Sequence, residues 1–178
     1  TTVTVESWPD TTTNYPEESF FMFTGVQVVK GELININVNE SEVIRWKKTY
    51  YKSNANGDTT EGSSDNPFVV MGKSDNGYLV ADTVKYSLVG LISAEVDQFG
   101  DPVMSPVVSA TVLPSEGTLL TEGALNAGQG FIGSDYSQIA HASGYLYLAF
   151  NDDIYHDNLY SWNVNITTFG PTPTPTPL

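Results

Sequence analysis

Apolar and polar residues alternate with period two along most of the chain. In residues 34–39 isoleucine and valine alternate with asparagine, and in residues 162–167 tryptophan, valine and isoleucine alternate with asparagine and threonine. This alternation predicts strands with one buried and one solvated face. Further strands are expected at residues 3–6, 19–29, 43–52, 68–71, 78–81, 86–93, 107–113, 138–142 and 145–150.

No stretch of a dozen residues carries the periodic apolar stripe of a helix. Many short strands separated by Gly, Pro, Asn and Asp are typical of an all-β, antiparallel β-sandwich. Residues 170–178 alternate proline with threonine, a pattern that favours an extended polyproline II spacer. We therefore expect one folded domain at residues 1–169 and a Pro-Thr linker or tail at residues 170–178.

Composition and charge narrow the classes of partner. Charged residues make up 16% of the chain, against about 25% in an average globular protein, and Thr, Ser, Asn and Gly replace them. The net charge of −14 argues against binding to nucleic acid or to anionic membranes. Together with the Pro-Thr spacer, this composition indicates an extracellular protein, secreted or at the cell surface. The chain begins without a basic and apolar leader, so a signal peptide is expected to have been removed or not included.

Acidic and amide side chains are concentrated between the expected strands at residues 145–150 and 162–166. Calcium takes roughly six to eight oxygen ligands from carboxylates, amides, carbonyls and water, so this loop has the composition of a calcium site. Its acidic and amide residues are Asn151, Asp152, Asp153, Asp157 and Asn158. The alternative is that these residues only form a hairpin turn. Without a cation the carboxylates would repel one another and raise at least one pKa.

Four segments, in order, carry a resemblance to a known family: residues 23–36, 86–93, 130–134 and 143–166. The chain resembles the calcium-dependent galactophilic lectins typified by the PA-I lectin, and the related galactose-binding-like domains of secreted bacterial hydrolases. The resemblance implies a jelly-roll β-sandwich. It also implies a bound Ca²⁺ whose coordination is completed by two hydroxyls of a sugar.

The resemblance implies specific calcium ligands. Asp152 matches the family's aspartate ligand, and Asp157 and Asn158 match its second pair, with aspartate in place of the usual first asparagine. Asn151 and Asp153 are secondary candidates. A carbonyl ligand is expected from Tyr155 or from one of its neighbours, Ile154 and His156, and a second carbonyl from an early loop near residues 43–46.

The residues that would contact the sugar differ from the family pattern. The galactose-binding lectin uses a histidine and a glutamine from a middle loop, but this chain has no histidine between residues 1 and 140, so galactose itself is in doubt. Candidate ligand-binding residues are Trp46, Asp65, Asn66 and His156. The alternatives are that Trp46 belongs to the core and that Asp65 and Asn66 are turn formers.

The chain has two histidines and none of the catalytic motifs of hydrolases, metalloproteases or phosphate-binding loops, so we expect no enzymatic activity. The sequence predicts a non-catalytic, calcium-dependent carbohydrate-binding module. Carbohydrate is its expected partner, with copies of itself as another. The alternative is a structural subunit of an extracellular filament or surface layer, in which the threonine-rich start could be a donated strand.

Overall fold

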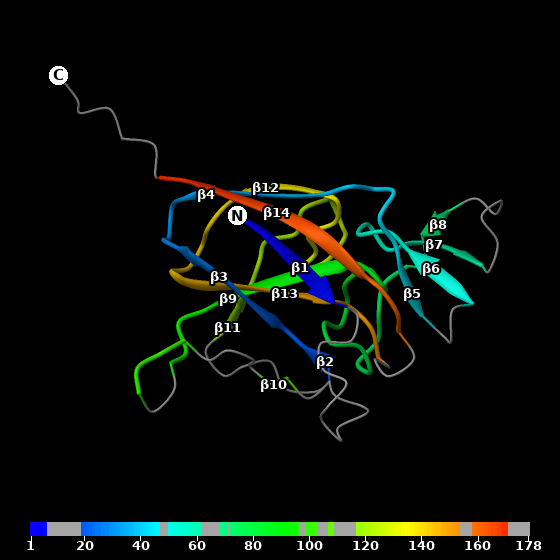
Figure 1. Cartoon of the computed structure of the whole chain (residues 1–178), viewed down its shortest axis with the longest axis horizontal. Helices are drawn as coiled ribbons and strands as arrows, with labels where there is room; N and C mark the ends of the chain where they lie inside the picture. The colour runs from blue at the N-terminus through cyan, green and yellow to red at the C-terminus, as the bar shows by residue number, and fades with distance from the viewer. Residues whose placement is uncertain are drawn as a thin grey trace.

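The computed structural model describes residues 1–6, 19–46, 50–61, 68–70, 72–96, 99–102, 107–108, 117–153 and 158–170. All regular secondary structure in these ranges is β-strand, so the expected all-β class is confirmed (Figure 1). Within the same ranges no helix is long and apolar enough to cross a membrane.

Two four-stranded antiparallel sheets form the sandwich. The first sheet has the order β1-β14-β4-β12, and the second has the order β11-β9-β13-β3. The strands of the first sheet are β1 (Thr2–Glu6), β14 (Ser161–Phe169), β4 (Leu33–Val38) and β12 (Asp135–Ile139). The strands of the second sheet are β11 (Gly117–Leu119), β9 (Leu88–Ser93), β13 (Gly144–Phe150) and β3 (Met22–Val28).

The main hydrophobic core lies between these two sheets. Alternate side chains of β4 and β14 face it from the first sheet, which explains the period-two pattern of both segments. Trp162 is fully buried and packs edge-on against Phe150 of the second sheet, with ring centroids 5.3 Å apart. The strands thus bury the apolar positions that the sequence pattern selects.

The two central strands of the second sheet, β9 and β13, are largely buried on both faces. Every residue of β9 is buried, and a smaller cluster, in which Leu79 and Val80 join Phe21 and Tyr147, covers the outer face of the sheet. The strand expected at residues 78–81 is not formed; these residues are a bent segment that packs on that cluster. These residues are apolar because they are buried, and they do not pair with a neighbouring strand.

A third antiparallel sheet, of order β5-β6-β7-β8, extends from one end of the sandwich (Figure 1). Its strands are β5 (Ile44–Trp46), β6 (Tyr51–Ser53), β7 (Asp58–Glu61) and β8 (Val69–Val70), and a short separate pair joins β2 (Ser19–Phe20) to β10 (Val107–Val108). The single strand expected at residues 43–52 is therefore two strands, in which Trp46 pairs with Tyr51.

The N-terminal strand pairs within its own chain. β1 lies antiparallel to β14, with Thr2 opposite Asn165 and Glu6 opposite Ser161. The pairing extends to the terminus, since the amino group of Thr1 donates to the carbonyl of Ile166 at 2.8 Å. In this structure the segment is an edge strand of the first sheet.

Candidate calcium and ligand-binding site

The candidate site begins where β13 ends. Asn151 is fully buried, and its side chain binds the backbone of a distant segment: Oδ1 accepts from the N–H of Val80 at 2.9 Å. Its Nδ2 donates to the carbonyls of Val80 and Val84, each at 3.1 Å. Asn151 is thus a clamp that fixes residues 80–84 against the end of β13.

Asp152 places a carboxylate inside the protein. Its side chain is 3% exposed. Oδ1 accepts the backbone N–H of Asp153 at 2.7 Å, and Oδ2 accepts the amide Nδ2 of Asn158 at 2.8 Å. The side-chain oxygen Oδ1 of Asn158 is also buried and accepts no hydrogen bond from the described residues. The structure therefore brings Asp152 and Asn158 together as the sequence predicts, while Asp153 is exposed beside them.

Burial dominates the electrostatics of this carboxyl. Removal from water is the main reason that the pKa of Asp152 rises from 3.8 to about 8. The hydrogen bonds from the Asn158 amide and from the N–H of Asp153 oppose the rise, whereas the carboxylate of Asp153 adds to it. The free acid is consequently favoured at neutral pH in the absence of a cation. The repulsion that the sequence predicts between the loop carboxylates is present, but it is smaller than the effect of desolvation.

Two buried tyrosines line the same region. The hydroxyl of Tyr78 donates to that of Tyr86 at 2.8 Å. Burial raises the pKa of Tyr78 to about 12, with further contributions from the negative charges of Asp153 and Asp152. The pKa of Tyr86 is raised more strongly, again mainly by burial. Both phenols therefore stay neutral, and the single proton of Tyr78 is donated to Tyr86.

Tyr86 adopts a left-handed backbone, with φ of 57°, which is uncommon for a bulky residue. Its N–H donates to the carbonyl of Asn151 at 2.8 Å, and its ring stacks on Trp46 with centroids 3.7 Å apart. Trp46 also stacks on Tyr51 at 4.5 Å and is only 7% exposed. Trp46 therefore belongs to an aromatic stack under the loop, and little of its ring surface is available to a ligand.

The far side of the loop docks on β5. Leu159 and Arg45 exchange two backbone hydrogen bonds, of 2.9 Å from Arg45 N–H and 2.7 Å from Leu159 N–H. Residues 43–46, from which the resemblance expects a carbonyl ligand, therefore lie next to the segment that carries Asn158. The carbonyl of Arg45 is already engaged by Leu159.

The remaining sequence candidates fall outside the described residues. These are Asp157, Tyr155, His156, Asp65 and Asn66. Among the described residues, no three His, Cys, Asp or Glu side chains are close enough to hold a metal ion. The described part of the candidate site therefore consists of one buried carboxylate (Asp152), one exposed carboxylate (Asp153) and two buried amides (Asn151 and Asn158).

Sequence reasoning missed the clamp of Asn151 and the tyrosine pair of Tyr78 and Tyr86. The partners of Asn151 lie 71 and 67 residues away, so no local pattern reveals them. Both tyrosines lie in apolar segments, around residues 78–81 and 86–93, and this position indicates that their rings are buried. It does not indicate that the two rings contact each other.

The structure also has an open cleft of about 570 Å³. It is bordered by residues 123–127, by Phe131 and by the carboxylates of Glu40, Asp58 and Asp135. None of the residues predicted from the sequence as site residues lines it. Comparison with known proteins adds no assignment, since no protein-family model and no curated protein matches the chain.

Proposed function

We propose that the chain is a non-catalytic, calcium-dependent carbohydrate-binding module of a secreted or cell-surface protein. The observation that carries the proposal is the buried carboxylate of Asp152, held against the amide of Asn158 at the end of β13. We further propose that the antiparallel sandwich is of the jelly-roll, galactose-binding-like type.

A buried carboxylate is costly unless a positive charge or several hydrogen bonds compensate it. Among its partners are the neutral amide of Asn158 and the backbone N–H of Asp153, and the pKa of Asp152 is still raised to about 8. Strongly shifted carboxyl groups are common at functional sites. A divalent cation would favour the ionised form of Asp152 and cancel its repulsion with Asp153.

The residues at hand fit the chemistry of calcium, which selects carboxylate, amide and carbonyl oxygens. Asp152 and Asn158 supply a carboxylate and an amide from opposite ends of the loop. Rotation of the Asn158 amide by about 180° exchanges Nδ2 and Oδ1, so the same side chain can hydrogen-bond the metal-free carboxylate or offer its oxygen to a cation. Asp157 and a carbonyl of residues 154–156 are the other expected ligands.

Two features of the scaffold also support the proposal. The hydrogen bonds of Asn151 and the stacking of Trp46 on Tyr86 hold the base of the loop against buried parts of the protein. Ligands that are already in place bind a cation more tightly than ligands that must first be ordered. The pairing of Leu159 with Arg45 brings residues 43–46 beside the loop. Bound calcium would supply a charge that orients vicinal hydroxyls of a sugar.

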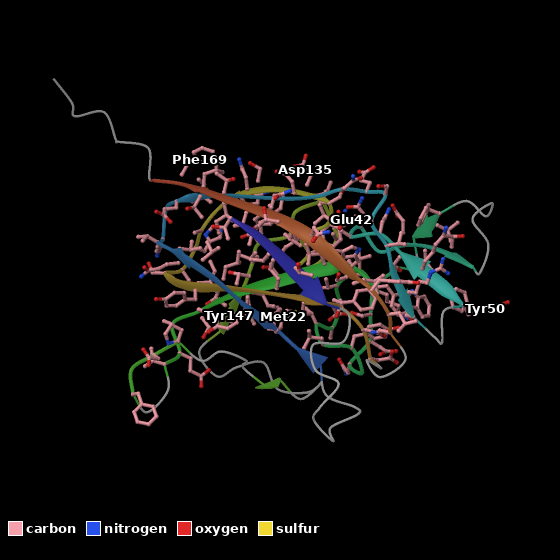
Figure 2. The ribbon with its side chains drawn as sticks, viewed as in Figure 1. Met22, Glu42, Tyr50, Asp135, Tyr147 and Phe169 are labelled. Atoms are coloured by element: carbon pink, nitrogen blue, oxygen red, sulfur yellow. The ribbon has the colours of Figure 1, made fainter. Side chains whose placement is uncertain are left out.

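Calorimetric titration with calcium tests the metal site. We expect the wild-type protein to bind calcium and Asp152→Asn to lose that binding. Asp135→Asn is the matched control, because it makes the same change at an exposed position of β12, where Asp135 accepts from Asn37 (Figure 2). Equal calcium affinity in all three proteins would refute the site.

A glycan array tests the carbohydrate claim. Wild-type protein is applied with calcium, and again with a chelator and with excess calcium restored. We expect binding that disappears on chelation and returns with calcium. Binding that is indifferent to the chelator would contradict a role for the ion, and the absence of binding to any glycan would contradict the lectin function.

A further inference from the structure

We propose that the ring of Tyr160 is a stacking platform for a neutral pyranose bound beside the calcium loop. The inference rests on the calcium-dependent sugar binding proposed above and identifies the part of the sugar that the metal would not contact. Tyr160 follows Asn158 by two residues, so their Cα atoms are at most about 7.6 Å apart. Its side chain is 64% exposed.

The backbone of Tyr160 is in the left-handed region, with φ of 74°. A side chain with a ring is strained there, whereas glycine adopts this conformation without steric cost. Because most of the ring lies outside the core, its burial does little to offset that strain. Strained residues that persist on a surface are concentrated at binding sites, and a ligand-binding role accounts for a tyrosine at this position.

The ring is also held in place. Leu159, the preceding residue, is fixed to Arg45 by the two backbone hydrogen bonds that join it to β5. The guanidinium of Arg45 lies 6.0 Å from the centroid of the Tyr160 ring, within the range of a cation–π contact. A ring fixed in this way loses little conformational entropy when a ligand stacks on it.

The chemistry of the surroundings selects the ligand class. An aromatic ring packs against the apolar C–H face of a pyranose, while the hydroxyls on the ring edge need polar partners. The proposed calcium ion would take a vicinal pair of those hydroxyls. An anionic sugar is disfavoured by the carboxylates of Asp152 and Asp153 and by the net charge of −14, so we assign a neutral pyranoside.

Tyr50 is an exposed tyrosine that lies away from the candidate loop. Tyr50 is 51% exposed at the outer end of the third sheet, where Figure 2 shows it pointing away from the protein. Its ring contacts Tyr51 edge-on. Tyr50 therefore offers a matched control, a half-exposed tyrosine in a different part of the molecule.

The experiment compares wild type, Tyr160→Phe, Tyr160→Gly and Tyr50→Ala. Each is titrated calorimetrically, in calcium, with the methyl pyranosides of galactose, glucose, mannose and fucose, and metal affinity is measured separately by terbium luminescence without sugar. We expect Tyr160→Phe and Tyr50→Ala to keep the wild-type sugar affinity within about twofold. Tyr160→Gly should bind sugar about tenfold more weakly or worse with unchanged terbium affinity. Because glycine relieves the backbone strain, this variant should remain folded.

The outcomes separate the two proposals. If Tyr160→Gly binds the pyranoside as tightly as wild type, the platform is wrong while calcium-dependent sugar binding stands. If Tyr160→Gly loses terbium binding as well, Tyr160 acts through the metal loop and the platform is again wrong. If wild type binds terbium but none of the pyranosides, the platform and the lectin function are both wrong and only the metal site survives.

Discussion

Replacing Asp152 by asparagine should stabilise the metal-free protein at neutral pH. The substitution replaces a carboxyl group that is 3% exposed, and that must take up a proton on folding at neutral pH, with a neutral amide of almost the same volume. Its new amide group can donate to the side-chain oxygen of Asn158 after that amide rotates, and its oxygen can still accept the N–H of Asp153. The protein would then keep both hydrogen bonds of the loop without burying a carboxylate.

The magnitude follows from the pKa of Asp152, which rises from 3.8 to about 8 on folding. Because the folded-state pKa is the higher one, the folded protein binds more protons than the unfolded chain between these values. Stability from this group is therefore complete below pH 3.8 and is lost as the pH rises toward 8, by at most about 1.4 kcal/mol per pH unit. By pH 7 the loss is at most about 4 kcal/mol.

Water entry and relaxation of the loop reduce the cost of a buried charge. We therefore expect Asp152→Asn to gain about 2 kcal/mol in free energy of unfolding at pH 7, or about 4 to 8 °C in Tm. Urea unfolding at intervals from pH 4 to pH 8, in the presence of a chelator, gives both values. The difference between variant and wild type should grow with pH.

Asp135→Asn at an exposed position corrects for the general effect of removing one negative charge. In saturating calcium the order should reverse, since a ligand at 100 times its Kd stabilises by about 2.7 kcal/mol and the variant no longer binds it. The reasoning would be refuted by a variant that is less stable than wild type at pH 7 without calcium. It would equally be refuted by a stability difference that does not change with pH.

Three further predictions follow from the same contacts. Because calcium must displace the proton of Asp152, the apparent affinity of the protein for calcium should rise with pH up to about 8 and stay constant above it. Calorimetry in buffers of different ionisation enthalpy should detect close to one proton released per bound calcium at pH 6. If no proton is released, Asp152 is not a calcium ligand. Asn151→Ala should cost about 2 to 3 kcal/mol, because it leaves the N–H of Val80 without its acceptor and removes one donor from each of the carbonyls of Val80 and Val84, which keep the hydroxyls of Ser74 and Ser87. Chemical unfolding should show the same loss with and without calcium, whereas a loss confined to the calcium form would make Asn151 a metal ligand instead of a clamp. The filament alternative predicts assembly, which light scattering after size exclusion detects; a monomer that forms no larger species on addition of calcium would argue against it.

The fold was predictable where one face of a strand is buried and the other is solvated. β4 and β14 alternate apolar residues with asparagine and threonine, and both form close to the expected positions. The hydrophobic pattern gave a wrong prediction where apolar residues are buried without pairing in a strand. Leu79 and Val80 are buried by the cluster on the second sheet, yet their backbone bonds to Asn151 and Asp152 rather than to a neighbouring strand.

β7 and the division of residues 43–52 were missed for a different reason. Thr59 and Thr60 of β7 are both 2% exposed, so polar residues occupy buried positions, and Thr59 shares a hydroxyl contact of 3.0 Å with Ser53. The turn between β5 and β6 falls in a stretch with no Gly, Pro, Asn or Asp, the residues that usually mark turns.

The sequence predicts which residue types the candidate site contains, but not which groups each of them contacts. The loop pattern and the resemblance selected Asp152 and Asn158, which the fold brings within 2.8 Å. They also selected Asn151 as a metal candidate, whereas its amide is used to hold residues 80–84. Nothing local distinguishes these two uses of asparagine, because the difference lies in which distant backbone reaches the side chain.

The direction of β14 has a consequence for how the protein could present its ligand. The candidate loop lies at the start of this strand and residue 170 at its end, with eight residue steps from Ser161 to Phe169, or about 26 Å along an extended strand. Anything attached beyond residue 170 would therefore be joined at the pole opposite the loop. A tether there would leave the candidate loop and Tyr160 facing outward, free to reach the proposed glycan on another surface.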